Sequence, residues 1–347
     1  MIWIAWRFQR SVVCALALLA LVIIGFTVFV GTAQHHDLFE LMSPPCRGSQ
    51  IATPGRGDYC GVLAVKLDNA AQFDPYIRWA GFVIAPLVGA ILGLLALASE
   101  VESRTVRLAW TQSISRTRWF VAKAGVGAAL VAVILVPTAI VFSWWSGTIG
   151  ATSLFGRETY GIAGWDLFAY GLFMFALTLF LGALIRRVGW TLPASVLVFL
   201  VIAVTFPSAV RQHLVTPTVL WVPATAATKG NAAVYGESVY PAYIQENAWI
   251  LVNGVARRST VGVPTWKQVN AISTQVYSCV NTYPQKTQRD IVNAEGKCYQ
   301  KFGVENVEVY ISDDQFWTMQ LREGILYLSA GLILAGGALV LLRRIEP

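Results

Sequence analysis

The stretch that decides the fold is Ser99–Lys123, SEVESRTVRLAWTQSISRTRWFVAK, a charged segment in a chain of which only 13% of the residues are charged. It lies between two long apolar runs and carries five basic residues: Arg104, Arg107, Arg116, Arg118 and Lys123. Because basic loops favour the cytoplasmic side of a membrane, we expect this segment inside the cell. Apolar residues also recur in it at a helical spacing: Val106, Ala109, Trp110 and Ile114. The spacing predicts a short helix that docks a cytoplasmic partner, and the alternative is a helix that only rests on lipid headgroups.

The rest of the chain has the composition of a membrane protein. Hydrophobic residues make up 56% of the 347 residues, against roughly 45–50% in soluble domains, and the mean hydropathy is +0.57. Six apolar runs are each close to the roughly 20 residues that cross the hydrocarbon core of a bilayer. They are Ser11–Val30, Trp79–Ala98, Ala124–Ser143, Leu167–Ile185, Trp190–Phe206 and Gly324–Leu342. The sequence therefore predicts an all-α polytopic membrane protein with six transmembrane helices.

Charge fixes the expected orientation of these six spans. With both termini in the cytoplasm, the inner segments hold eleven basic residues and three acidic ones. The first outer loop, residues 31–76, holds three basic and five acidic residues. This asymmetry predicts a multi-pass protein of the cell membrane with both ends inside.

The amino-terminal residues 1–10 have their own pattern. They contain aromatic and basic residues, Trp3, Trp6, Arg7 and Arg10, and read as an amphipathic helix at the inner leaflet. A cleaved signal peptide is the alternative for the run that follows. We expect an uncleaved span, because the run of about twenty residues exceeds the roughly 7–15 of a signal core.

Four of the five cysteines fall in the two outer segments, and Cys14 falls in the first span. Two disulfides on the oxidising side of the membrane are expected, Cys46–Cys60 and Cys279–Cys298, with unpaired thiols as the alternative. The second outer segment, residues 207–321, is long enough for a small α+β extracellular domain. It contains a predicted hairpin at Asn253-Gly254 and a predicted strand at residues 307–312. The expected organisation is thus an interfacial amphipathic helix at residues 1–10, followed by spans one to five within residues 11–206. The coupling loop 99–123 lies between the second and third of these spans. The outer domain 207–321 follows, and residues 322–347 hold the sixth helix and a cytoplasmic tail.

Several kinds of chemistry have no counterpart in the sequence. No GxxxxGK[ST] phosphate-binding loop occurs. The predicted spans hold almost no ionisable residues at their centres, which argues against a proton- or sodium-coupled carrier and against an intramembrane hydrolase. The cysteine spacing and the three histidines do not match a metal site, and no basic-aromatic patch indicates nucleic-acid binding. We therefore expect no catalytic residues, cofactor or metal in this chain.

Particular residues resemble a known family. The first loop resembles the first cytoplasmic loop of actinobacterial ABC-2 type transporter permeases in Glu100, Glu102, Thr105, Arg107, Trp110 to Ser113, Arg116, Arg118-Trp119 and Lys123. The start of the chain, with Trp3, Trp6-Arg7 and Arg10, and the approach to the last span, with Phe316-Trp317, Gln320 and Glu323, are similar too. One departure is Arg104, where the broader pattern usually has Gly before Thr.

The resemblance implies the permease subunit of an ATP-binding-cassette exporter that moves a hydrophobic, lipid-like or peptide substrate outward. It implies two permease subunits, identical or different, in the lipid bilayer, and separate ATPase subunits that bind ATP and Mg²⁺. The residues implied to couple to the ATPase are Glu100, Glu102, Arg104, Thr105, Arg107, Trp110, Gln112, Arg116 and Arg118. The alternative is an ATPase-linked membrane sensor or immunity component that translocates nothing.

Overall fold

The computed structural model describes residues 2–41, 59–98, 102, 115–148, 160–216, 218–223, 248–251, 277–284, 290–291, 294, 297–298, 301, 304–310 and 315–344. Contacts divide the chain into two compact units. The first, here called the helical unit, contains Met1–Ala151, Glu158–Phe206 and Trp317–Pro347, and the second includes Pro207–Phe316.

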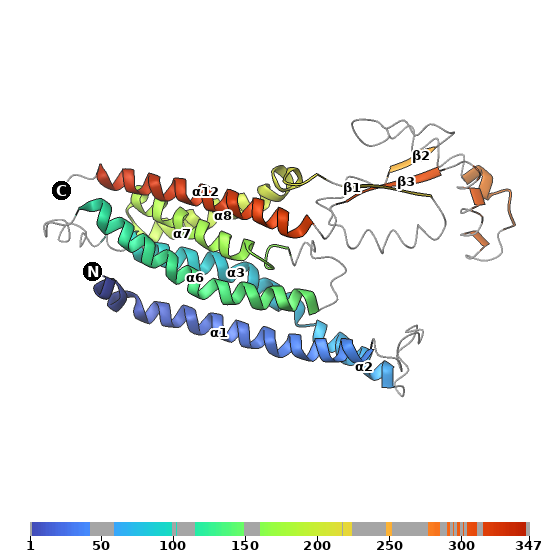
Figure 1. Ribbon diagram of the computed structural model, residues 1–347, viewed down its shortest axis with the longest axis horizontal. Helices are drawn as coiled ribbons and strands as arrows, with labels where there is room; N and C mark the ends of the chain where they lie inside the picture. Colours follow the sequence, from blue (N-terminus) through green and yellow to red (C-terminus); the bar gives the residue numbers. More distant parts are fainter. Residues whose placement is uncertain are drawn as a thin grey trace. The chain divides into compact units, whose positions relative to one another are not determined.

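The helical unit is built from long helices that run side by side (Figure 1). Their bounds are α1 Ile2–Leu41, α2 Tyr59–Ala71, α3 Asp74–Gly93 with the π-helix η1 Leu94–Ala98, α6 Arg116–Thr148, α7 Asp166–Ile185, α8 Val188–Ala209 and α12 Phe316–Arg343. Helix α1 begins and α12 ends at the same end of this unit, here called the terminal end, and the opposite end is called the far end (Figure 1).

Within the part of the chain that the structure describes, six segments are long and apolar enough to cross a membrane, as the sequence predicted. They are Arg10–Leu41, Tyr59–Ala98, Arg116–Gly147, Asp166–Ile185, Val188–Pro207 and Phe316–Arg343. The polytopic helical architecture is therefore confirmed.

Element boundaries differ from the predicted ones in three places. Helix α1 runs without a break from Ile2 to Leu41, so no boundary separates the predicted interfacial helix 1–10 from the first span. It also extends into the predicted outer loop 31–76, where α2 follows and packs against it. Helix α6 begins at Arg116, which places the end of the predicted loop 99–123 in a spanning helix. The reason is tertiary: buried Gln34 near the end of α1 and buried Trp119 near the start of α6 extend each helix's packed surface beyond its apolar run.

Glycines bring α3 and α7 into backbone contact. A Cβ atom at Gly89 would overlap the carbonyl oxygen of Gly171, and one at Gly93 would lie 2.7 Å from the carbonyl oxygen of Phe175. One turn beyond, a Cβ at Gly182 would lie 3.1 Å from the Cβ of Ala98. Small residues allow this approach, which replaces side-chain packing by direct backbone contact. The Gly89-x-x-x-Gly93 pair of the sequence is thus a helix-packing motif.

Two buried apolar clusters hold the spanning helices together. The larger joins α1, α3 with η1, α6, α7 and the last part of α12, and its fully buried side chains include Phe142 and Trp145. The smaller joins α7, α8 and α12 around Phe173, Met174 and Tyr327. Helix α8 nevertheless exposes most of its apolar side chains, as a helix surrounded by lipid or by another subunit would.

The second unit contains an antiparallel sheet of strand order β1-β3-β2. Its strands are β1 Thr218–Pro223, β2 Ala248–Leu251 and β3 Val304–Tyr310, and the register pairs Val219 with Val309 and Trp249 with Asn306. The predicted strand 307–312 overlaps β3, whereas the predicted Asn253-Gly254 turn lies outside the described residues.

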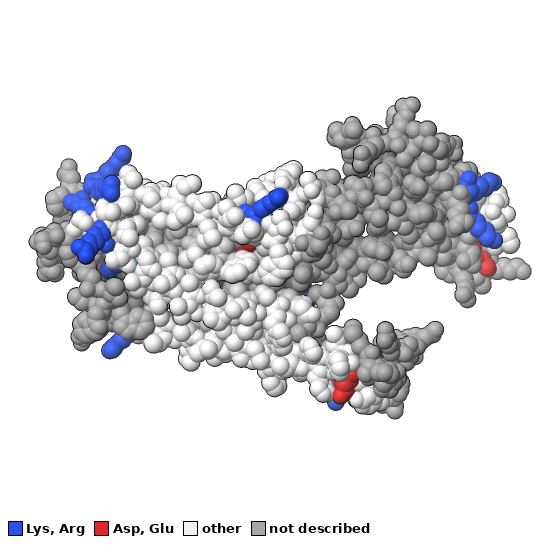
Figure 2. Space-filling model, viewed as in Figure 1, with Lys and Arg blue, Asp and Glu red and all other residues white. Residues whose placement is uncertain are grey.

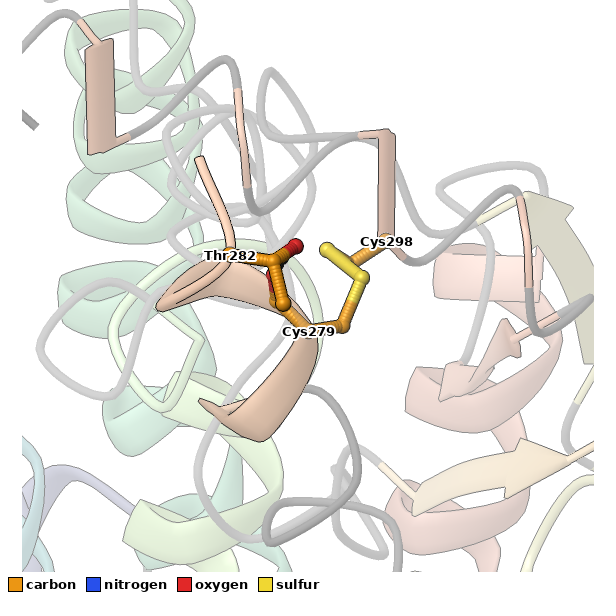
Figure 3. Close-up of a disulfide and its surroundings, with 3 residues drawn as sticks. All are labelled: Cys279, Thr282 and Cys298. Carbon is orange, nitrogen blue, oxygen red and sulfur yellow. Dashed lines mark hydrogen bonds between the residues drawn. A yellow bond between two sulfur atoms is a disulfide. The ribbon is translucent and has the colours of Figure 1, made fainter. Parts of the chain in front are cut away.

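A disulfide links Cys279 to Cys298, 19 residues apart, as predicted (Figure 3). Both cysteines are buried, and the hydroxyl of Thr282 donates a 2.6 Å hydrogen bond to the carbonyl oxygen of Cys279. In the other predicted pair, Cys60 is disulfide-bonded, whereas Cys46 lies outside the described residues, so that pairing stays a prediction. Cys14 is a free cysteine and is exposed.

Candidate functional site

Basic side chains gather at the terminal end of the helical unit, and on the face shown few charged side chains lie between its two ends (Figure 2). The exposed arginines of this end lie at or near the ends of five helices: Arg10 of α1, Arg118 of α6, Arg186 and Arg187 between α7 and α8, and Arg343 and Arg344 at the end of α12. The charges that predicted cytoplasmic segments thus converge on one surface. An exposed surface of one sign of charge favours an oppositely charged partner.

A π-helix joins α3 to the first loop. After Gly93 the α-helix α3 changes to η1, in which Ala96, Leu97 and Ala98 are buried. Ala98 contacts Gly182 near the end of α7. Single π-turns inside helices are rare and are frequent at functional sites. The π-helix thus places the start of the first loop beside the end of α7.

Glu102 lies just beyond this π-helix and binds the start of α8. Its Oε2 atom accepts a 2.7 Å hydrogen bond from the backbone N–H of Val188, the first residue of α8. The first N–H groups of a helix have no partner within it, and its positive N-terminal end favours a carboxylate. Arg186, in the left-handed conformation with φ of 59°, ends α7 and makes the tight turn that presents this N–H.

Arg116 binds the end of α12 in a similar way. Its Nη1 atom lies 3.2 Å from the carbonyl oxygen of Arg343 and 3.5 Å from that of Leu342. In return, Nη2 of Arg343 donates a 3.1 Å hydrogen bond to the hydroxyl of Thr117. The last carbonyls of a helix are unpaired and favour a cation. The start of α6 and the end of α12 are therefore joined by reciprocal contacts.

Trp119, which belongs to the sequence motif of the first loop, is a core residue. It is 3% exposed and packs in the larger apolar cluster beside Phe120. The ammonium of Lys123 lies 5.1 Å from the centre of its ring. This part of the motif anchors α6 and is not available to a partner.

The predicted coupling residues thus divide into three groups. Glu102, which is exposed, and Arg116, which is half-buried, contact other helices of the same chain, and Arg118 is exposed. The others lie outside the described residues: Glu100, Arg104, Thr105, Arg107, Trp110 and Gln112. In the predicted interfacial helix, Arg10 is exposed, while for Trp3, Trp6 and Arg7 the structure describes only the helical backbone. Among the described residues, no group of three His, Cys, Asp or Glu side chains could hold a metal ion.

Sequence reasoning missed two buried polar networks at the far end. In the first, Gln320 of α12 donates to the carbonyl oxygens of Tyr160 and Ala163, both at 3.0 Å, and accepts from the backbone N–H of Asp166 at 3.1 Å. One turn further along α12, Glu323 accepts a 2.6 Å hydrogen bond from the hydroxyl of Tyr170. The i, i+3 spacing of Gln320 and Glu323 on an otherwise apolar helix was the available signal.

The second network joins α1, α3 and α6. Gln34 donates to Oδ1 of Asp74 at 2.7 Å and accepts from the indole N–H of Trp145 at 3.1 Å. All three side chains are buried. Both networks satisfy polar groups that would be costly in an apolar interior, and so fix which helices meet there.

Comparison with known proteins gives one match. A family model described as ABC-2 membrane transporter related matches residues 13–211, more than half of the chain. The matched region includes α1 from Val13 onward and the whole of α3, the first loop, α6, α7 and α8. No curated protein and no solved structure matches the chain.

Proposed function

Since the chain belongs to the ABC-2 membrane transporter related family and is a transporter permease subunit, we propose that it exports a hydrophobic, lipid-like or peptide substrate with a separate ATPase subunit. The observation that carries the proposal is the family match over the first five spanning segments. The sequence contains no GxxxxGK[ST] loop, so in this proposal the partner binds ATP and Mg²⁺ and this chain contributes no catalytic residue.

The ATPase would dock on the terminal end of the helical unit. The exposed arginines there, such as Arg118 and Arg187, support an acidic surface on the partner. Trp110 and Arg107 of the first loop would supply an aromatic anchor and a charge at the centre of the contact. Both termini of the chain would then lie in the cytoplasm, and the second unit would lie outside the cell membrane.

The proposed substrate class follows from the spanning helices. Hydroxyl groups within them are bound to their own helix: Thr27, Thr138 and Thr178 each donate to the carbonyl oxygen four residues earlier, at 2.8–2.9 Å. Such hydroxyls offer little to a strongly polar ligand. The exposed apolar faces of α8 and α12 support contact with lipid and with a second permease subunit, across which an amphipathic substrate could move.

Transport would follow the rearrangement of packed helices. Closure of the ATPase dimer would push on the first loop, and the spans would change between two packed arrangements rather than deform continuously. The glycine contact of α3 with α7 makes these two helices the fixed reference for that change.

The test is copurification followed by transport. A tagged chain would be purified from its own membranes, and the bound ATPase identified by mass spectrometry. Replacing Trp110→Ala together with Arg107→Glu should weaken the complex about thirtyfold or more, because a buried aromatic anchor contributes about 2 kcal/mol. A matched control is Trp317→Ala with Arg322→Glu, an exposed pair near the start of α12, at the far end of the helical unit.

Two outcomes separate the possibilities. If no ATPase copurifies with the unaltered chain, the proposal is wrong. If an ATPase copurifies but vesicles containing the complex show no ATP-dependent movement of any lipid or peptide probe, the ATPase-linked sensor is favoured instead.

A further inference from the structure

We propose that Glu102 and Arg116 are positioning residues that link the two ends of the first loop to α8 and α12, and that they do not contact the ATPase. This inference rests on the proposed function and deepens it, because it names the helices that respond to ATPase docking. The resemblance of the loop to ABC-2 permeases had assigned both residues to the ATPase surface. Their contacts within the chain assign them otherwise.

The link to α8 starts at Glu102. Its carboxylate is held by the N–H of Val188 at 2.7 Å, although the two residues are 86 positions apart in the chain. Only 11% of the α8 span is buried, against 61% of the α7 span, so few core contacts fix α8. A single charge-assisted hydrogen bond at its first residue is therefore a large part of what holds this end of the helix.

The link to α12 starts at Arg116. Its guanidinium binds the carbonyl oxygen of Arg343 at 3.2 Å, and Arg343 binds Thr117 at 3.1 Å. Only 22% of the α12 span is buried. Each of the two helices thus donates a hydrogen bond to the other. A shift of the start of α6 along its axis would therefore move the end of α12 as well.

The signs of charge agree with this role. A carboxylate meets the positive N-terminal end of α8, and a guanidinium meets the negative C-terminal end of α12. Glu102 is exposed and Arg116 is half-buried, but each charged group is engaged by a helix end of its own chain. Arg118, two residues after Arg116, is also exposed, and it is the residue of this segment that we assign to the partner protein. The same sequence segment thus holds residues for two tasks, distinguished by what they touch.

Helix α7 would not follow such a movement. Gly89 and Gly171 place the backbones of α3 and α7 in direct contact, and sliding them would drive backbone atoms into one another. The contact of α12 with α7 is looser: a Cβ at Gly331 of α12 would lie 3.6 Å from that of Ala176, an ordinary packing distance, and Tyr327 packs against Phe173 of α7 and Phe206 of α8. A push on the first loop would therefore move α8 and α12 relative to a fixed α3–α7 pair.

The experiment compares binding with coupling in the complex of this chain with its copurified ATPase. Glu102→Ala and Arg116→Ala should leave ATPase binding within about twofold of the unaltered chain. They should lower the substrate moved per ATP hydrolysed roughly tenfold, the factor that corresponds to losing a hydrogen bond to a charged group. Arg118→Ala is the matched control, and it should weaken ATPase binding without changing that ratio. Arg116→Lys, which keeps a cation at the end of α12, should restore much of the coupling.

A second measurement needs no ATPase. Spin labels at Arg118→Cys and Arg187→Cys, in a Cys14→Ala background, report the distance between the starts of α6 and α8. Glu102→Ala should broaden this distance distribution, whereas Glu102→Gln, which keeps an acceptor oxygen for Val188, should leave it narrow. An unchanged distribution in Glu102→Ala overturns the link to α8. Loss of ATPase binding in Glu102→Ala or Arg116→Ala, as large as in Arg118→Ala, shows that these residues are ATPase contacts. Failure of the proposed function is distinct, because then no ATPase binds the unaltered chain.

Discussion

The hydroxyl of Tyr170 on α7 donates a 2.6 Å hydrogen bond to the carboxyl group of Glu323 on α12, although 153 residues separate the two in the chain. The ring of Tyr170 also meets the ring of Tyr327 edge to face, 4.8 Å between centres. With Arg116 at the terminal end, α12 is thus tied by polar contacts at both ends and packs through apolar side chains between them.

The Tyr170–Glu323 bond should contribute measurably to stability. Tyr170→Phe and Glu323→Ala, which removes the acceptor oxygens, should each destabilise the protein, and the double variant should cost less than the sum of the two. A coupling of about 0.5–1.5 kcal/mol is expected, the usual net value of an internal hydrogen bond. The stability of the unaltered protein, the two single variants and the double variant would be measured by thermal unfolding in detergent, with size-exclusion chromatography reporting the folded fraction. Strict additivity would show that the bond contributes nothing to the folded state.

The α3–α7 contact should not tolerate a side chain. Gly89→Ala places a methyl group against the carbonyl oxygen of Gly171, and overpacking of this kind costs about 1–3 kcal/mol. The expected result is a lower melting temperature of the solubilised protein. Gly125→Ala is the control, because nothing lies within 4 Å of a Cβ at that position, and it should leave the melting temperature unchanged or raise it. Equal melting temperatures for the two variants would contradict the close packing.

The disulfides should stabilise the regions that they close. A loop of about this length contributes roughly 3 kcal/mol when cross-linked. Replacing Cys279 and Cys298 together by Ser should make the second unit more sensitive to protease, and Cys14→Ala should have little effect. Peptide mapping without reductant should recover Cys279 joined to Cys298 and Cys46 joined to Cys60. Links that cross between the two pairs would require a different arrangement of the outer segments.

The two ends of the helical unit should face opposite sides of the membrane. In a Cys14→Ala background, a cysteine at Arg187 should be protected from an impermeant maleimide added to intact cells, because the positive-inside rule places the terminal end in the cytoplasm. A cysteine at His36, which is exposed near the end of α1 in the far half of the unit, should react. Labelling of both positions, or of neither, would reject the six-span orientation.

The sequence was sufficient for the number of spans because that number depends on local composition. Each apolar run must cross the same thickness of hydrocarbon, so its length and hydropathy suffice. The ends of the helices could not be predicted from local composition in the same way. Helix α1 continues to Leu41 past its apolar run, and Gln34 within this extension finds partners in Asp74 and Trp145, which lie far along the chain.

The same limit applies to the candidate site. Charge alone indicated that Glu102, Arg116 and Arg118 belong to one basic end of the protein, and the structure places Arg116 and Arg118 there with the other arginines. Charge could not indicate that Glu102 meets Val188 or that Arg116 meets the end of α12, because those partners are 86 and 227 residues distant. A pattern within one segment records what kind of environment a residue needs, not which helix supplies it.

The glycine contact between α3 and α7 also has a consequence for the order in which the helices enter the membrane during synthesis. The ribosome completes α3 first and must then produce α6 before α7 exists, so the glycine face of α3 enters the bilayer without its partner. Until α7 inserts, the backbone at Gly89 and Gly93 lacks the helix that it contacts in the finished protein. The buried cluster shared by α1, α3, α6 and α7 can therefore form only after the fourth span has inserted, and Ala338 and Leu342 of α12 join it last. A nascent chain that stops after α6 would present to membrane quality control a surface that the finished protein never shows.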